Sequence, residues 1–392
     1  MVGANAVRDV AMKLPVGFQA AGISAGLKRS GRPDLALLYS EAPLVWAFTG
    51  TTNVVQAPCV TRNRQLYAGG TPVHAVVVNS GNANCANGAA GARDNDAYAA
   101  AMAEALGVSP AEVLTASTGI IGRPMPMEGL LTGLPRAQAE LGFEADAFAR
   151  AILTTDLVPK TAEAELPGGA RVVGVTKGSG MIHPNMATML AFVMTDATVD
   201  QAALRALWPE VVGASFNQLT VDGDTSTNDM AIVFSTGRVA CEVSDLQRAL
   251  TEVCVSLAKQ IARDGEGATK LMTVRVTGAA SPEEARAAAK TVAGSSLVKT
   301  AVHGADPNWG RILAAAGRSG VASDPARVRV AAQGFDLYVG EPLPFDEAEV
   351  SAALKADDVI LEVDLAVGSA TGEAWGCDLS AEYVRINADY TT

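Results

Sequence analysis

The chain has 392 residues, 49% of them hydrophobic but only 5% aromatic, and a formal net charge of -12 at pH 7. This length exceeds one ordinary hydrophobic core, so we expect two packed units or one large layered unit, with a core filled mainly by Ala, Val and Leu. The negative charge argues against nucleic acids and anionic membrane surfaces as partners.

The five cysteines are scattered along the chain without a CxxC pair. This pattern is typical of neither a disulfide framework nor a zinc site, and we expect no metal and no cofactor. It fits a reducing, cytoplasmic setting. The first residues, Met1 to Lys13, lack a basic segment followed by an apolar one, and no long uncharged apolar stretch follows, so we expect neither a signal peptide nor a membrane span.

The first half of the chain mixes strand and helix patterns. A helix is predicted from Pro135 to Leu153, with an apolar stripe formed by Leu141, Phe143, Phe148 and Ile152. Clusters of Asn, Ser and Gly, such as Ser80-Gly81-Asn82, indicate turns between these segments. Strands are predicted at 34–39, 45–52, 74–79, 113–116 and 170–176, and a further helix at 92–106.

The second half repeats this mixture. Strands are predicted at 189–194, 231–235, 270–277, 328–332 and 359–367, and helices at 201–214, 244–263 and 282–292, before a last segment at 383–386. Strands and helices in both halves predict an α/β arrangement of layers. The alternation is irregular, so the pattern does not indicate a doubly wound parallel sheet.

A Gly-rich turn, Lys177-Gly178-Ser179-Gly180, opens the most informative stretch, which continues to Leu190. Within it, Thr188 is a candidate nucleophile. A threonine hydroxyl needs a base, and the α-amine of an N-terminal threonine can serve as one, with a pKa of roughly 7.7–8.0. Thr188 would gain such an amine only if the chain were cut after Ala187. The alternative is an ordinary β-branched residue at the start of a strand.

The stretch from Lys177 to Leu190 resembles the cleavage-site signature of the bifunctional glutamate N-acetyltransferase/ornithine acetyltransferase family of arginine biosynthesis. Further blocks resemble that family in the same order, and together they cover nearly the whole chain. These blocks are Asn79–Asn84, Ser117–Gly122, Thr154–Asp156, Asp222–Asp229, Asp306–Arg311 and Ile386–Tyr390.

This resemblance implies a layered α/β/β/α sandwich with a smaller C-terminal α/β domain. It also implies self-cleavage into an α chain (1–187) and a β chain (188–392), the latter including a C-terminal subdomain from about 280. Both chains would stay together, and a higher oligomer of αβ pairs is expected.

The resemblance also assigns site residues. Thr188 is the nucleophile, and the cut lies between Ala187 and Thr188. The hydroxyl of Thr118 and the backbone N–H of Gly119 form the oxyanion hole, although an ordinary turn is the alternative there. The substrate-binding residues are Thr154, Lys177, Thr188, Glu266, Asn387 and Thr392.

Two of these assignments have a chemical reason. The Lys177 cation suits the carboxylate of an N-acetyl amino acid, and the Glu266 carboxylate suits the side-chain ammonium of ornithine. A solvated lysine and a helix-terminating loop are the respective alternatives. His183 precedes the cut, so we interpret it as structural or cleavage-assisting. The Asp222–Asp229 stretch lacks the glycine and final acidic residue of a calcium loop.

The function implied by the resemblance is acetyl transfer from N2-acetylornithine to glutamate through an acetyl-threonine, in arginine biosynthesis. Acetyl-CoA is a second donor that some relatives of this family accept. One alternative is a self-processing aminopeptidase or amidase of related architecture, in which water resolves the acyl-enzyme. Another is an uncleaved α/β protein without this chemistry.

Overall fold

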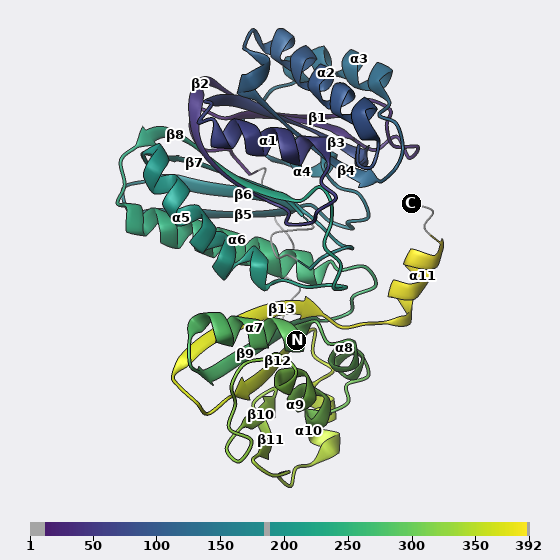
Figure 1. Cartoon of the computed structure of the whole chain (residues 1–392), viewed down its shortest axis with the longest axis vertical. Coiled ribbons are helices and arrows are strands. Elements are labelled where there is room, and N and C mark those ends of the chain that lie inside the picture. The colour runs from purple at the N-terminus through teal and green to yellow at the C-terminus, as the bar shows by residue number, and fades with distance from the viewer. Residues whose placement is uncertain (1–11, 184–188, 390–392) are drawn as a thin grey trace, which may run out of the picture.

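The computed structural model describes residues 12–183 and 189–389. Ala187 and Thr188, where the sequence predicts a cut, and the terminal Thr392 lie outside the described residues. In Figure 1, an upper body made by the first two thirds of the chain stands above a smaller C-terminal unit.

The upper body contains an eight-stranded sheet in the order β4-β3-β2-β8-β7-β6-β5, with β1 paired to β2. Its strands are β1 (Gln19–Ile23), β2 (Leu35–Gly50), β3 (Val73–Asn82), β4 (Val113–Ile120), β5 (Lys160–Glu165), β6 (Arg171–Lys177), β7 (Leu190–Ala197) and β8 (Met230–Val239). Most neighbours are antiparallel, but β3–β4 and β7–β8 are parallel. This mixture agrees with the expectation that the sheet is not doubly wound.

Strand β2 joins the two halves of this sheet. The sequence predicts two strands, at 34–39 and 45–52, but the structure has one strand of 16 residues. Its first half pairs with β3 and its second half with β8, and the register with β3 shifts between Tyr39 and Leu44. Pro43, which has no backbone N–H to donate, lies in this shift. The prediction was wrong because it took this interruption for a strand end.

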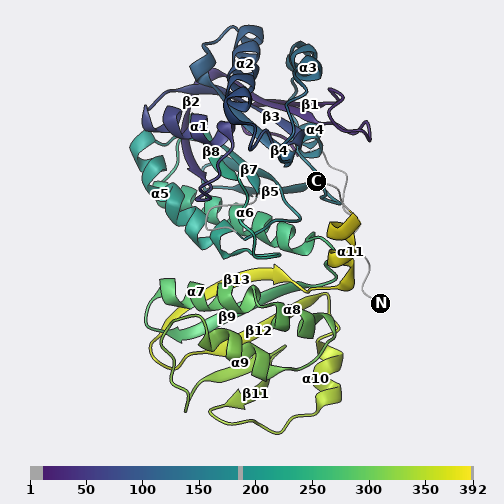
Figure 2. The same cartoon turned by 45° about the vertical axis from the view of Figure 1, so that its right-hand side comes forward.

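The two halves of the sheet pack face to face, with helices on both outer faces (Figures 1 and 2). Side chains from both halves form one inner core, in which the rings of Phe148 and Phe192 meet edge to face, 5.2 Å apart. Outside lie α2 (Gly88–Leu106) and α3 (Met127–Ala139) on one side, and α5 (Gln201–Ala214) and α6 (Val243–Arg263) on the other. The chain thus has the layered α/β/β/α architecture.

Helix α6 shows why these layers form. Its buried residues include Leu246, Leu250, Val253, Leu257 and Ile261, which recur every three or four residues and so make one apolar stripe. This stripe packs on β5 and β6. The same periodicity correctly predicts this helix and α5 from the sequence.

The helix predicted from Pro135 to Leu153 is wrong in its middle. Helix α3 ends at Ala139, and the short α4 (Asp146–Ala151) begins afresh. Between them the chain leaves the helical conformation, because Gly142 exchanges backbone hydrogen bonds with Ala20. Phe143, assigned to the apolar stripe, is 69% exposed. Long-range pairing with the N-terminal segment therefore overrides the local helical pattern.

The C-terminal unit is built on a second sheet, in the order β11-β10-β12-β9-β13. Its strands are β9 (Leu271–Ala279), β10 (Arg329–Ala332), β11 (Phe335–Val339), β12 (Asp358–Asp364) and β13 (Ala370–Cys377). Its helices are α7 (Pro282–Ala293), α8 (Ser296–His303), α9 (Trp309–Gly317) and α10 (Glu347–Ala353). Helix α11 (Ala381–Asp389), which contains the segment at 383–386, leads the chain back towards the upper body (Figure 2).

The remaining helix, α1 (Pro58–Ala68), and two 3-10 turns, Pro110–Glu112 and Phe216–Gln218, complete the described elements. None of the helices in the described part of the chain combines the length and the apolar character that crossing a membrane requires.

Candidate active site

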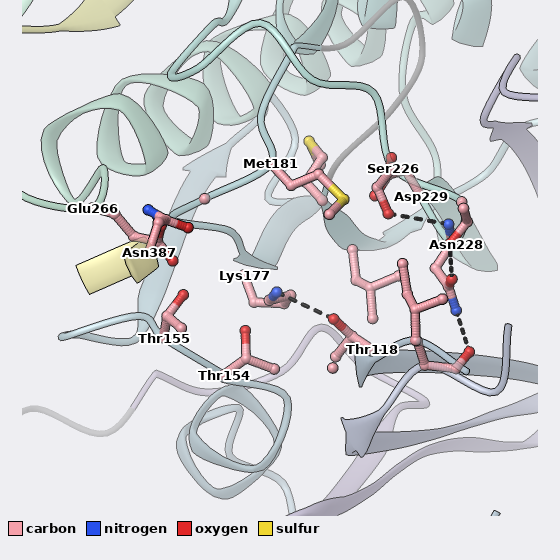
Figure 3. Close-up of a pocket in the computed structure, with 17 residues that line it drawn as sticks. Thr118, Thr154, Thr155, Lys177, Met181, Ser226, Asn228, Asp229, Glu266 and Asn387 are labelled. Atoms are coloured by element: carbon pink, nitrogen blue, oxygen red, sulfur yellow. Dashed lines mark hydrogen bonds between the residues drawn. The ribbon is translucent and has the colours of Figure 1, made fainter. Parts of the chain in front are cut away.

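A cavity of about 130 Å³ opens where strands of the upper body end, and segments far apart in the sequence line it (Figure 3). Lys177, the last residue of β6, pairs with Leu190, the first of β7, so both strands meet at the cavity. Six of the residues assigned by sequence resemblance line it together: Thr118, Gly119, Thr154, Lys177, Glu266 and Asn387. Met189, the residue after Thr188, lines the same cavity.

Thr118 and Gly119 lie near the end of β4, beside the parallel strand β3. Gly119 has a φ of +131°, and a Cβ there would lie 2.4 Å from the carbonyl carbon of Gly81. Only glycine fits such a backbone and such a close approach. Asn228 holds the ends of β3 and β4 together. Its side-chain amide donates hydrogen bonds to the carbonyl oxygens of Ser117 and Ala83, at 2.8 and 2.6 Å.

The Lys177 side chain lies inside the cavity and is only 8% exposed, so the alternative of a solvated surface lysine is wrong. Its ammonium donates a hydrogen bond to the hydroxyl oxygen of Thr118 over 3.2 Å. Burial lowers the pKa of Lys177, although the nearby carboxylates of Asp156, Asp229 and Glu266 favour the charged form. The cavity therefore holds a lysine amine with little water around it, on whose charge burial and the neighbouring carboxylates act in opposite directions.

Glu266 supplies an opposite charge on another wall of the cavity (Figure 3). Its backbone N–H donates to the carbonyl oxygen of Ser179, at 2.9 Å. Its carboxylate accepts a hydrogen bond from the Asn387 amide at 2.9 Å, which brings helix α11 to the site. A Cβ on Gly180 would lie 2.4 Å from this carboxylate, so the Gly-rich turn leaves the space that Glu266 occupies.

Thr154 and Thr155 line the cavity opposite Met181 (Figure 3). The backbone N–H of Thr154 donates to Asp156 Oδ2 at 3.0 Å. The Thr154 carbonyl oxygen accepts a hydrogen bond from the Arg32 guanidinium at 3.3 Å. Both contacts hold the backbone of this loop and leave the threonine hydroxyls facing the cavity.

The segment that leads towards residue 184 is anchored by the loop before β8. Asp222 accepts hydrogen bonds from the backbone N–H groups of Met181 and Ile182, at 2.5 and 2.7 Å. His183 Nδ1 lies 2.9 Å from the hydroxyl of Thr220. Burial, with a smaller contribution from Lys290, lowers the pKa of His183 to about 4, so this ring is neutral at pH 7.

Sequence reasoning did not single out several charged or polar residues around the cavity. Asn228 and Asp229 line it, whereas Asp156, Lys160 and Asp264 form a buried ion network close to it. Asp156 and Asn228 belonged to recognised sequence blocks but had no assigned role. Lys160 shows no motif, because its partners lie 4 and 104 residues away. Within 12–183 and 189–389, no group of three or more His, Cys, Asp or Glu side chains could hold a metal ion.

Comparison with known proteins agrees with this architecture. The ArgJ family model matches residues 19–392. The arginine biosynthesis bifunctional protein ArgJ of Thermus thermophilus is 57% identical over 386 residues, which cover 98% of this chain and 100% of that protein. The protein of the same name from Deinococcus radiodurans is 56% identical over 379 residues, which cover 96% and 97% of the two chains.

A solved structure is also similar. A chain of the arginine biosynthesis bifunctional protein argJ of Bacillus halodurans is 47% identical, with a TM-score of 0.50, and the match covers 52% of this chain and 100% of that chain. The family model and the two sequence relatives span both halves of the sequence, including the residues that line the cavity. The protein therefore belongs to the ArgJ family of arginine biosynthesis, and it is an acyltransferase.

Proposed function

We propose that this protein transfers acetyl from N2-acetylornithine to glutamate through an acetyl ester of Thr188, after cutting its own chain between Ala187 and Thr188. One observation carries the proposal. A single cavity is lined by a hydroxyl and glycine pair (Thr118 and Gly119), by a buried cation (Lys177) and by a carboxylate (Glu266), and Met189, next to Thr188, lines it too. These groups suit acyl transfer of a charged amino acid, because they offer donors for an oxyanion and partners for the substrate charges.

The first step is self-cleavage. The Thr188 hydroxyl attacks the carbonyl carbon of Ala187, and the Ala187–Thr188 bond passes from amide to ester. Water then hydrolyses the ester, which leaves a carboxylate on Ala187 and a free α-amine on Thr188. That amine takes the hydroxyl proton in the later steps, with a pKa close to working pH.

The acetyl group then passes through two covalent steps. The Thr188 oxygen attacks the acetyl carbonyl of N2-acetylornithine, and the negative charge that develops on the carbonyl oxygen is stabilised by the Thr118 hydroxyl and the Gly119 N–H. Because the Lys177 ammonium donates to Thr118 Oγ1, the hydroxyl proton of Thr118 remains available for this oxygen. Ornithine leaves as its amine takes a proton, and the amine of glutamate attacks the acetyl ester to regenerate Thr188.

Charge orients both substrates. Lys177 binds the α-carboxylate, and Glu266, with Asn387 beside it, binds the side-chain ammonium of the ornithine donor. Thr154 and Thr392 complete the binding residues. Acetyl-CoA serves as a second donor, and αβ pairs assemble into a higher oligomer.

The length of the matched Bacillus halodurans chain supports the cut. That chain is matched along its whole length by 52% of this protein, and the segment from 188 to the C-terminus makes up the same share of the 392 residues. A separate chain that begins at the residue corresponding to Thr188 and continues to the C-terminus would have this length.

The test is the intact mass of the denatured protein, beside Thr188→Ala and Thr188→Ser variants. We expect two fragments that meet between Ala187 and Thr188 in the wild type and in the serine variant, and one full-length chain in the alanine variant. Incubation with acetyl-labelled N2-acetylornithine should then move label to glutamate and release little free acetate without glutamate. A single chain in the wild type, or equal acetate release with and without glutamate, would contradict the proposal.

A further inference from the structure

A buried ion network that the proposed mechanism does not use lies beside the cavity. The Lys160 ammonium is fully buried and contacts two carboxylates, Asp156 Oδ1 at 2.7 Å and Asp264 Oδ2 at 2.5 Å. Both carboxylates are themselves almost inaccessible to solvent. Removing three charges from water is unfavourable, and the attraction within the ion pairs often does no more than offset this penalty. The stability of the fold therefore does not by itself explain the network.

The network fastens two segments that shape the cavity. Asp156 Oδ1 also accepts the backbone N–H of Gly178 at 2.6 Å, and Oδ2 accepts that of Thr154 at 3.0 Å. Asp264 Oδ2 accepts the N–H of Leu157 at 3.1 Å. Asp156 is therefore held in place next to the residue that follows Lys177, and Lys160 in turn holds Asp156.

Lys177 needs a nearby negative charge. It is 8% exposed, and the hydrogen bond that its ammonium donates goes to a neutral hydroxyl, that of Thr118. A buried ammonium in such surroundings tends to lose its proton. The charged groups around it are Asp156, Asp229 and Glu266, which favour the ammonium, and Lys160 and Lys28, which oppose it.

Among these carboxylates, Asp156 contributes most to the charged form of Lys177. The effect is mutual. Burial raises the pKa of Asp156, but the charges of Lys177 and Lys160 and the hydrogen bonds outweigh it and bring that pKa well below its usual range. Glu266 is already engaged by Asn387. Asp156 accepts two backbone N–H groups, and its negative charge acts on two ammonium groups, those of Lys160 and Lys177.

We propose that Asp156, held in place by Lys160, is the positioning residue that keeps the Lys177 ammonium charged inside the cavity. The positive charge of Lys160 itself repels the Lys177 ammonium and so weakens this effect of Asp156. Lys177 can then hold a substrate carboxylate without being permanently neutralised by a direct ion pair. The inference rests on the proposed function only for the role of Lys177 as the carboxylate anchor.

The experiment is an NMR titration of the lysine side chains in the whole protein labelled with carbon-13 at Cε, with the Lys177 signal assigned through Lys177→Arg. Asp156→Asn should lower the titration midpoint of Lys177 by at least about one pH unit, because a nearby opposite charge is lost. Lys160→Met should raise it, because a like charge is lost. The double variant should return it towards the wild-type value.

Asp196→Asn is the matched control. Asp196 is a buried carboxylate at the far end of β7 that accepts two backbone N–H groups, from Val16 at 3.1 Å and Arg171 at 2.7 Å. Its loss should disturb the fold about as much as that of Asp156 without moving the Lys177 midpoint. A general loss of structure cannot shift this midpoint in opposite directions in the two single variants.

Binding of N2-acetylornithine provides the second readout. As the pH is raised, the affinity for N2-acetylornithine should begin to fall at a lower pH in Asp156→Asn than in the wild type. This difference should match the difference between the two Lys177 midpoints. Equal Lys177 midpoints in the wild type and Asp156→Asn, or shifts of the same sign in both single variants, would overturn the inference. Where Lys160→Met does not fold, Asp156→Asn and the double variant still decide it. Absence of acetyl transfer by the wild type contradicts the proposed function instead, since the titration needs no turnover.

Discussion

The Thr118 hydroxyl has two tasks in the proposed mechanism, because it accepts from Lys177 and donates to the reacting oxygen. Thr118→Val removes the hydroxyl and nearly preserves the shape of the side chain. We expect kcat to fall about 100- to 1,000-fold, the usual loss when one oxyanion donor is removed, while the KM for N2-acetylornithine changes little. Steady-state kinetics of Thr118→Val and of the wild type measures this effect.

Thr155→Val is the matched control for that substitution. Thr155 lines the same cavity and has no assigned role in the chemistry. Its variant should keep kcat within a few-fold of the wild type. If both variants lose the same activity, the hydroxyl of Thr118 has no special role.

Glu266 is expected to distinguish the two substrates by charge. Glu266→Gln retains a hydrogen-bonding group for Asn387 but loses the negative charge. We expect the KM for N2-acetylornithine to rise roughly 10- to 100-fold, since a hydrogen bond to a charged group contributes about 1.5–3 kcal/mol. The KM for glutamate, which carries no side-chain ammonium, should change much less.

A comparison of the two half-reactions tests this expectation, with Glu163→Gln as the control. Glu163 pairs with Arg171 on the exposed part of β5, outside the cavity. Equal increases in KM for both substrates of the Glu266 variant would mean that its carboxylate shapes the cavity without selecting a charge.

Much of the cavity could be predicted at the residue scale, because motif resemblance names side chains one by one. Thr118, Lys177 and Glu266 are spread over 149 residues of sequence, and yet they line one cavity. The ion network of Asp156, Lys160 and Asp264 could not be predicted. Its members acquire their roles only through burial and mutual distance, which no local pattern encodes.

At the scale of elements, periodicity was reliable where one face of a segment is buried. Helix α5 was predicted with its observed bounds, and α6 to within one residue at its start. The failures lie where distant segments decide the structure. Strand β2 continues through its bend because its second half pairs with β8. The segment at 140–145 is not helical because it forms bridges with residues of the N-terminal segment at 12–20.

The stripe of α6 also leads to a stability prediction. Leu257 is fully buried and packs beneath β6, where a Cβ on Gly174 would lie 2.7 Å from its Cδ1. Leu257→Ala should lower the free energy of unfolding by about 2–5 kcal/mol through lost burial and a residual cavity. Urea titration measures the change. Val243→Ala, on the same helix but 44% exposed, should change it by less than about 1 kcal/mol.

For the whole molecule, we expect the free energy of unfolding to depend on pH below neutrality. The pKa of His183 is lowered to about 4 in the fold, against 6.5 in the unfolded chain, so the unfolded state binds more protons between these values. Stability should therefore fall as the pH drops from 6.5 to 4. Asp156, whose pKa is depressed, adds a further loss at lower pH, since its contribution disappears as pH falls through its folded pKa.

Urea midpoints at several pH values between 4 and 7.5 test this dependence. The uncut Thr188→Ala protein is the suitable background, because it separates stability from processing. In that background, His183→Gln should flatten the slope between pH 6.5 and 4. An unchanged slope would assign the acid sensitivity to other groups.

The order of strands in the upper sheet has a consequence for how the protein would unfold and refold after the proposed cut. The two strands from after residue 188, β8 and β7, lie side by side between strands from before it, β2 on one side and β6 on the other. After the proposed cut, the two chains would share one sheet. They could separate only if the β2–β8 and β6–β7 ladders both opened. Folding must then precede the cut, and recovery of the denatured mature protein should be second order in concentration, whereas the uncut variant should refold at a rate independent of it.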